Sequence, residues 1–294
     1  MIDRSNLPNW RSILFVPALN ERFIAGAATR GADCIQLDLE DAIPPQQKRQ
    51  ARETVANVAD RLSSEGCDII VRINRPWRMA VADIEASVRA SVCALTLPKV
   101  PHAGHIGSIC ELIDEVEREQ GLAAGHTGLI VMIETAAALF RMDEIARASD
   151  RVIGLIVGAE DLAVSMGMHP THQSLFVPNV QLVAAARAAG RMPLGFVGSV
   201  AGYSDPDGYR ALIREARALG FTGAFAIHPS QVPILNAEFA PSPEEVKDAR
   251  DLIATFEQGM SEGRGAISHK GKMVDLPVVE QARAILAAHT RFSS

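Results

Sequence analysis

The chain has 294 residues, of which 48% are hydrophobic, 22% are charged and 5% are aromatic, and its formal net charge is -6. This composition is typical of one large or two smaller globular α/β domains, and the negative charge without a basic stripe argues against a nucleic-acid-binding surface. Four cysteines without a CxxC pair favour reduced thiols over a zinc site. No signal-peptide-like start or apolar run of membrane-spanning length occurs, which predicts a cytoplasmic protein.

Short apolar runs recur along the chain, with helical stretches between them. Each run is rich in Ile, Val and Leu and ends at a polar residue, Gly or Pro, as buried strands do. The predicted strands are 12–17, 34–40, 69–74, 94–99, 129–134, 152–161, 194–197 and 224–229. Strands that alternate with crossover helices predict a parallel (β/α)8 TIM barrel, with a doubly wound open sheet as the alternative.

The domain organisation follows from the absence of any linker-like composition within the barrel segment. We expect residues 11–240 to form the (β/α)8 catalytic domain. The remaining residues, 241–294, contain two segments with helical spacing, separated by a loop that contains Gly and Lys. This C-terminal helical extension is too short for an independent domain, and its loop is a candidate lid.

Polar residues follow the predicted strands at the same end. In chain order they are Asp38, Glu40 and Asp41, then Arg72 and Asn74, then Lys99, Glu134, Glu160 and Asp161, and finally His228. The carboxyl ends of the strands in a TIM barrel form a common mouth, which is where the active site lies. We therefore expect these side chains at the mouth, although each one taken alone could be a salt bridge or helix N-cap at the rim.

Two acids and one arginine suggest a chemistry for this mouth. Glu134 and Asp161 follow neighbouring strands and offer hard oxygen ligands, which suit Mg2+ or Mn2+ completed by water and substrate. The planar guanidinium of Arg72 suits a substrate carboxylate. Together they suggest that a small oxo acid is chelated while the cation neutralises an enolate or alkoxide.

The chain also carries an ordered series of motifs that resembles a known family. They are RSILFVP, LDLEDAI followed by K-x-x-AR, VRIN, LPKV, MIET, VGAEDL, AIHPSQ and GKMVD. The series resembles the CitE-like group of the HpcH/HpaI aldolase superfamily, which includes citrate lyase beta subunits, malyl-CoA lyases and citramalyl-CoA lyases. The resemblance covers nearly the whole chain. It implies a metal-dependent barrel that cleaves, or forms in reverse, a 3-hydroxyacyl-CoA into an acyl-CoA and a 2-oxo acid.

The resemblance also implies roles for individual residues at the mouth. Glu134 of MIET and Asp161 of AEDL would be metal ligands, and Arg72 of VRIN would bind the oxo-acid carboxylate. The acids of DLED would orient metal-bound water and this arginine. These acids are Asp38, Glu40 and Asp41, of which Glu40 and Asp41 join Arg72 as catalytic candidates.

Further roles are implied outside the mouth itself. Asp275 of GKMVD is similar to an acid/base residue that longer family members bring over a neighbouring subunit's active site, and its alternative role is a helix N-cap. Arg11, Lys48 and Arg52 match basic positions that would bind the phosphates of CoA, although the KRQAR segment is equally typical of a solvated helix face. A tail that acts on a neighbouring subunit requires a homo-oligomer, predicted as a trimer or hexamer.

The sequence leaves the exact reaction open. Ala18 stands where the family commonly has Gly, and the segment 194–205 lacks the Asp expected near the end of the seventh strand, so the particular acyl-CoA is not fixed. The leading hypothesis is a lyase for malyl-CoA or citramalyl-CoA. The alternatives are a thioesterase of the malyl-CoA type, and a citrate lyase beta-like subunit that acts on an acyl-carrier-protein thioester within a complex.

Overall fold

The computed structural model of the chain describes residues 7–199, 205–263 and 266–293. The chain divides into two compact units, Met1–Asn236 and Ala237–Ser294. Parallel strands and the helices that connect them make up the first unit, whereas two long helices and a β-hairpin make up most of the second.

The first unit contains a parallel sheet with the strand order β7-β6-β5-β4-β3-β2-β1-β8. Its strands are β1 (Ser12–Pro17), β2 (Cys34–Asp38), β3 (Asp68–Arg72), β4 (Ala94–Leu97), β5 (Gly128–Ile133), β6 (Val152–Val157), β7 (Met192–Leu194) and β8 (Ala224–Ala226). A parallel bridge between Leu194 and Gly223 links β7 to the start of β8. The predicted (β/α)8 TIM barrel is therefore confirmed.

Barrel closure depends on a close backbone approach at Gly223. A Cβ atom at this position would lie 1.9 Å from the carbonyl oxygen of Trp10, which no side chain could tolerate. The carbonyl of Gly223 also accepts a hydrogen bond from the amide of Gly195 at 2.8 Å. Glycine at residue 223 thus lets the backbone beside β8 fit between its neighbours.

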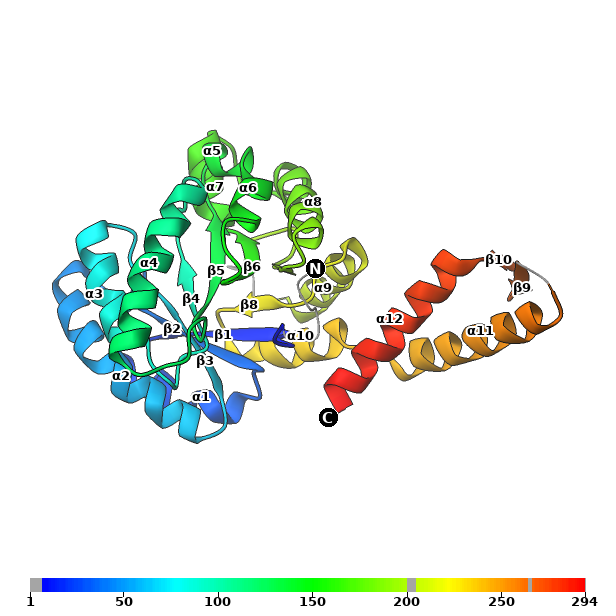
Figure 1. Cartoon of the computed structure of the whole chain (residues 1–294), viewed down its shortest axis with the longest axis horizontal. Helices are drawn as coiled ribbons and strands as arrows, with labels where there is room; N and C mark the ends of the chain where they lie inside the picture. The colour runs from blue at the N-terminus through cyan, green and yellow to red at the C-terminus, as the bar shows by residue number, and fades with distance from the viewer. Residues whose placement is uncertain (1–6, 200–204, 264–265, 294) are drawn as a thin grey trace. The chain divides into compact units, whose positions relative to one another are not determined.

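Helices and short 3-10 helices (η) connect the strands, and α2, α3 and α4 lie outside the strands that they join (Figure 1). They are α1 (Glu21–Ala27), η2 (Ala28–Arg30), η3 (Pro45–Gln47), α2 (Lys48–Ser64), α3 (Trp77–Ser87), α4 (Ala103–Glu119), α5 (Ala136–Leu139), α6 (Met142–Ala146), α7 (Ala159–Met166), α8 (His172–Ala188), α9 (Pro206–Leu219), η4 (Pro229–Gln231) and α10 (Val232–Phe239).

Helix α2 illustrates why these segments fold as amphipathic helices. Ala51, Val55, Val58, Ala59 and Leu62 are buried, and their spacing places them on one helical face. The remaining face of the helix is largely polar. The helix predicted between strands two and three is thus present as α2, and its apolar face is buried.

The barrel interior is apolar at the amino end of the strands and becomes polar toward the mouth. The apolar cluster consists of Trp10, Ile13, Cys34, Ile70, Ala94, Ile130, Ile156, Met192, Leu194 and Phe225. Two residues further along β2 and β4, the hydroxyl of Thr96 donates to Gln36 Oε1 at 2.6 Å. Side chains on one face of a strand recur every second residue, so the next inward-facing position of β2 is Asp38. Its partner in the register with β3 is Arg72.

Two predicted strands end earlier than expected. Strand β7 stops at Leu194 because Gly195 has φ +123°, so the prediction of 194–197 was displaced. Strand β6 stops at Val157, and Gly158 is the N-cap of α7. Glu160 and Asp161 therefore lie in the first turn of a helix, where carboxylates interact favourably with the helix dipole.

The second unit begins within α10 and continues through α11 (Pro243–Ser261), β9 (Ile267–His269), β10 (Lys272–Val274) and α12 (Leu276–Ser293). The antiparallel hairpin of β9 and β10 turns at Lys270 and Gly271, both of which have positive φ. A small core of Phe256, Val274 and Val279 joins the hairpin to the two long helices. The predicted C-terminal helical extension is thus confirmed as part of the fold.

Among the described residues, the structure contains no helix that is long and apolar enough to cross a membrane.

Candidate active site

The buried carboxylate of Asp38 organises the loop after β2. It accepts hydrogen bonds from the amides of Glu40 and Ala42, each at 2.9 Å. It also binds Arg72 in a bidentate manner, with Nε at 2.7 Å and Nη2 at 2.9 Å. Asp38 is therefore fully paired despite its burial, as a charged group inside a protein must be.

Arg72 lies at the centre of an acidic cluster. Its Nη1 atom lies 2.9 Å from Glu40 Oε2 and 3.2 Å from Asp41 Oδ2. The ring of Phe15 lies beneath the guanidinium, with the ring centre 4.6 Å from Cζ. Burial alone would lower the pKa of Arg72, but the three carboxylates raise it, so the guanidinium stays charged.

Glu40 bridges this arginine to Lys99. Its Oε1 atom accepts a hydrogen bond from Lys99 Nζ at 3.0 Å, while Oε2 contacts Arg72. Burial raises the pKa of Glu40, and Asp41 raises it further, against the lowering effect of the two cations. Lys99, which follows β4, is thus part of the same charge network as Arg72 and the acids of the loop after β2.

Glu134, which directly follows β5, is a buried carboxylate. The backbone amide of Lys99 donates to its Oε2 atom at 2.5 Å. Burial raises the pKa of Glu134 to about 7, and nearby Glu40 and Asp161 contribute in the same direction. The side chain lies against Gly158, where a Cβ atom would be only 2.4 Å from Glu134 Cγ.

Asp161 completes the group from the first turn of α7. Its Oδ1 atom lies 3.4 Å from Lys99 Nζ, and its side chain is 40% exposed. The structure thus brings together Asp38, Arg72, Glu134 and Asp161, which the sequence predicted at the mouth, although Asp161 comes from α7 and not from the end of the sixth strand. The group also includes Lys99, which was expected at the mouth without an assigned role, and Phe15 and Gly158, for which the sequence suggested no role.

The donor set fits a small divalent cation. Among the described residues, no cluster of three or more His, Cys, Asp or Glu side chains is arranged to hold a metal ion. Mg2+ commonly uses only one or two protein carboxylates and keeps several water molecules, so Glu134 and Asp161 are sufficient ligands of this kind. A cation would also compensate the crowded negative charge that raises the pKa of Glu134.

The basic residues predicted to bind CoA are engaged elsewhere. Lys48 Nζ donates to the carbonyl oxygens of Leu39 and Glu40, at 2.8 and 2.5 Å, and so fastens the loop after β2. Arg52 Nε pairs with the buried Asp83 at 2.8 Å. These contacts are structural, and the predicted phosphate-binding role of either residue stays a prediction.

Arg11 does not join the predicted site. It precedes β1 and binds Asp33, which precedes β2, with two hydrogen bonds of 2.7 and 2.8 Å. Because the strands are parallel, this pair lies at the amino end of the barrel, opposite the mouth. The position of Arg11 relative to its strand therefore separates it from the acidic cluster.

Other candidates have structural contacts. The ring nitrogen of His228 contacts the Ser230 hydroxyl at 2.7 Å and helps to cap η4. Asp275 lies in the second unit between β10 and α12, and its carbonyl accepts from the amide of Val279. Its predicted role as an acid/base stays a prediction.

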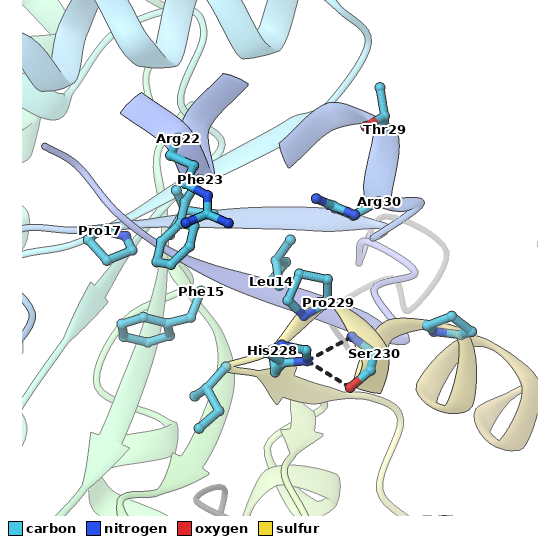
Figure 2. A pocket seen from close by; sticks show the side chains of 13 residues that line it. Leu14, Phe15, Pro17, Arg22, Phe23, Thr29, Arg30, His228, Pro229 and Ser230 are labelled. Carbon is cyan, nitrogen blue, oxygen red and sulfur yellow. Dashed lines mark hydrogen bonds between the residues drawn. The ribbon is translucent and has the colours of Figure 1, made fainter. Parts of the chain in front are cut away.

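A pocket of about 720 Å3 opens beside β1 and the loop after β8. Its lining combines apolar residues with two cations, Arg22 of α1 and Arg30 of η2. Figure 2 shows these two arginines on one side of the pocket and His228 with Ser230 on the other. Phe15 also lines the pocket, so one aromatic ring separates this space from Arg72.

Comparisons with known proteins show the family to which the chain belongs. The family model described as HpcH/HpaI aldolase/citrate lyase matches residues 11–229. The citrate lyase subunit beta of Leuconostoc mesenteroides subsp. cremoris is 34% identical over 281 residues, covering 94% of this chain and 92% of that protein. The L-malyl-CoA/beta-methylmalyl-CoA lyase of Cereibacter sphaeroides is 33% identical over 293 residues, covering 92% of this chain and 90% of that protein.

A solved structure is similar over the whole chain. The protein CitE from Mycobacterium tuberculosis, in complex with magnesium, acetoacetate and coenzyme A, gives a TM-score of 0.77 at 29% identity, covering 98% of this chain and 100% of that chain. The chain therefore belongs to the HpcH/HpaI aldolase/citrate lyase family. The predicted resemblance and the predicted enzyme class, a carbon-carbon lyase of this family, are confirmed.

Proposed function

We propose that this protein is a divalent-cation-dependent lyase for a 3-hydroxyacyl-CoA such as malyl-CoA or citramalyl-CoA. It would release an acyl-CoA and a 2-oxo acid, or join them in the reverse direction. The observation that supports this most is the meeting of Arg72, Glu134 and Asp161 within one network of charged contacts at the barrel mouth. The M. tuberculosis relative holds magnesium and coenzyme A, which the proposed reaction needs, together with a small oxo acid, acetoacetate.

Glu134 and Asp161 would hold the cation, Mg2+ or Mn2+. A bound divalent cation would supply positive charge next to the oxygens of the oxo acid. Arg72 would bind the carboxylate of the oxo acid. Among its partners, Asp41 has an exposed side chain (62%) and the longest contact (3.2 Å), so a substrate carboxylate could replace Asp41 without leaving a buried charge unpaired.

The pocket beside β1 would hold the CoA part of the substrate. Its volume lies within the range of roughly 300–1,000 Å3 usual for ligand pockets. Arg22 and Arg30 would bind phosphate groups, because no ion pair within the described part of the chain occupies either guanidinium. Phe15 would then lie between the thioester and the carboxylate bound by Arg72.

The chemistry requires one proton to leave and another to return. A base removes the proton of the substrate hydroxyl, the carbon-carbon bond breaks, and its electron pair passes to the acyl thioester as an enolate. An acid then protonates the enolate carbon. We assign this acid/base role to Asp275 from the second unit of a neighbouring copy, which would require a homo-oligomer of the predicted trimeric or hexameric kind.

Product analysis tests the proposal. The purified protein with Mg2+ is given malyl-CoA and citramalyl-CoA separately, and the products are identified by mass spectrometry. We expect acetyl-CoA with glyoxylate or pyruvate, and loss of both products in Glu134→Gln. Free CoA with malate or citramalate would establish a thioesterase instead. No turnover of either thioester, while the same acyl group on a carrier protein is cleaved, would establish a citrate lyase beta-like subunit.

A further inference from the structure

Lys99 has a backbone conformation that is unusual for its residue type. Its φ angle is +52°, in the left-handed region that favours glycine, and Lys270 of the hairpin is the other non-glycine residue with positive φ in the described chain. This conformation directs the amide of Lys99 to Glu134 Oε2. The carbonyl of Lys99 is held in turn by Arg75 Nε at 3.1 Å. Strained residues of this kind concentrate at functional sites.

The side chain of the same residue reaches the other acids of the mouth. Its Nζ atom lies 3.0 Å from Glu40 Oε1 and 3.4 Å from Asp161 Oδ1. One residue therefore contacts both candidate cation ligands, Glu134 through its backbone and Asp161 through its ammonium group. Positioning and charge are thus separable functions of Lys99.

The charge of the cluster explains why an ammonium belongs there. Five carboxyl groups meet two cations, because Asp38, Glu40, Asp41, Glu134 and Asp161 are joined to Arg72 and Lys99 by the contacts above. Arg72 is already shared by the three acids of the β2 loop. Lys99 is therefore the cation that balances the side of the cluster formed by β5 and α7.

We propose that Lys99 is a positioning residue that sets the affinity of the cation site. Its amide fixes one oxygen of Glu134, and its ammonium group stabilises Glu40 and Asp161 while it opposes a divalent cation by charge repulsion. The inference rests on the proposed function, because it takes Glu134 and Asp161 as the cation ligands. The family resemblance assigns Lys99 no part in that site.

Three variants test the function of the ammonium group while the backbone amide of residue 99 is kept. Lys99→Met removes the ammonium group but keeps the length of the stem. Lys99→Gly also removes it, retains the amide donor and relieves the left-handed backbone strain. Lys48→Met is the matched control, because Lys48 lies beside the same acidic loop but its ammonium binds backbone carbonyls.

The measurement is the dissociation constant for Mn2+, obtained by electron paramagnetic resonance of the free ion, together with Tm after chelator treatment. Removing a unit charge at contact distance should tighten Mn2+ binding by about tenfold or more in both Lys99 variants. Without the chelated cation, Tm should fall in Lys99→Met, and less in Lys99→Gly. Lys48→Met should lower Tm while its Mn2+ affinity stays within about twofold of the wild type, since the Lys48 ammonium binds backbone carbonyls and contacts neither candidate ligand.

Each other outcome overturns a defined part of the inference. Unchanged or weaker Mn2+ binding in both Lys99 variants would show that the ammonium does not set the affinity, and the proposed lyase activity would be unaffected. Mn2+ binding that is equally tight in wild type and Glu134→Gln would contradict the cation site itself, and with it the role of Lys99. If Lys48→Met tightened Mn2+ binding as much as the Lys99 variants do, the effect would come from the net charge of the mouth and not from the position of Lys99.

Discussion

The ring of Phe15 lies under the guanidinium of Arg72, with 4.6 Å between Cζ and the ring centre, and the same ring lines the pocket that contains Arg22 and Arg30. Phe15 alternates with outward-facing neighbours on β1, so its side chain points to the barrel mouth. One residue of the first strand thus separates the proposed thioester pocket from the proposed carboxylate site.

We predict that Phe15→Leu lowers kcat/KM for the CoA thioester by about tenfold, because a cation-π contact contributes about 0.5–2 kcal/mol and the pocket wall also changes. Steady-state kinetics on malyl-CoA and citramalyl-CoA would measure this. Phe23→Leu is the control, since Phe23 lines the same pocket but is 54% exposed. Equal effects of the two variants would contradict a special role for the ring beneath Arg72.

Asp38 and Asp41 contact the same arginine but should differ in their effect on stability. Asp38→Asn breaks a buried bidentate pair, which should lower the free energy of unfolding by about 3–5 kcal/mol. Asp41 has an exposed side chain, so Asp41→Asn should cost about 1 kcal/mol or less. Urea unfolding of the two variants checks the difference. Similar losses would show that burial does not govern the strength of these pairs.

Arg22 and Arg30 should govern binding of the thioester rather than the chemical step. We expect Arg22→Ala and Arg30→Ala each to raise KM for the CoA thioester by about tenfold with little change in kcat, because one charge-assisted phosphate contact contributes about 1.5–3 kcal/mol at most. The KM of the wild type should also rise with salt, and less steeply in the variants. Arg49→Ala provides a control, since its side chain is 86% exposed. A loss of kcat alone would argue against this pocket as the CoA site.

We expect that residue 158 must be glycine because a larger residue would collide with the side chain of Glu134, and not because its backbone conformation requires glycine. Its φ of -82° suits any residue, but an added Cβ would lie 2.5 Å from Glu134 Oε1. We predict that Gly158→Ala weakens Mn2+ binding and lowers kcat by about a hundredfold, which is a typical cost for a displaced active-site group. Gly154→Ala on β6, the strand that precedes Gly158, would contact Leu194 and Met192 instead, at 3.2 Å or more, and should affect stability only. Mn2+ affinity equal to the wild type in Gly158→Ala would refute this steric account.

Glu117 should make the barrel sensitive to acid. Burial would raise its pKa, but Arg151 and the amides of Thr127 and Gly125 lower it to about 2 from an ordinary value of 4.5. A lowered pKa in the folded state means stability that is present above pH 4.5 and is lost as pH falls toward 2, with an upper limit of about 3 kcal/mol. Unfolding free energies between pH 6 and 3 would show this slope. The slope should be shallower in Glu117→Gln, and equal slopes would assign the acid sensitivity to other groups.

The mouth residues could be predicted because strand periodicity and strand ends are visible in the sequence. Asp38, Arg72 and Glu134 each follow an apolar run, and the parallel barrel brings such positions to one end. Asp161 was placed at the end of a strand, whereas it belongs to the first turn of α7. Both positions are near the mouth, so the expected neighbourhood with Glu134 did not depend on the exact boundary.

The cationic residues could not be assigned in the same way, because their partners are distant in sequence. Lys48 uses backbone carbonyls and Arg52 uses Asp83, neither of which a motif reveals. Arg22 and Arg30 come from helical segments rather than strand ends. The left-handed backbone of Lys99 carries no local sequence signal, since lysine rarely adopts it.

The four hydrogen bonds of Asp38 have a consequence for how such a barrel can change its substrate during evolution. The same carboxylate holds the loop after β2 and the guanidinium of Arg72, so any replacement of that arginine also releases the loop. A descendant that lost the carboxylate-binding group would need compensating changes in two segments at once. Selection for new substrates should therefore act first on the walls around Phe15 and on the pocket, where single substitutions leave this pairing intact.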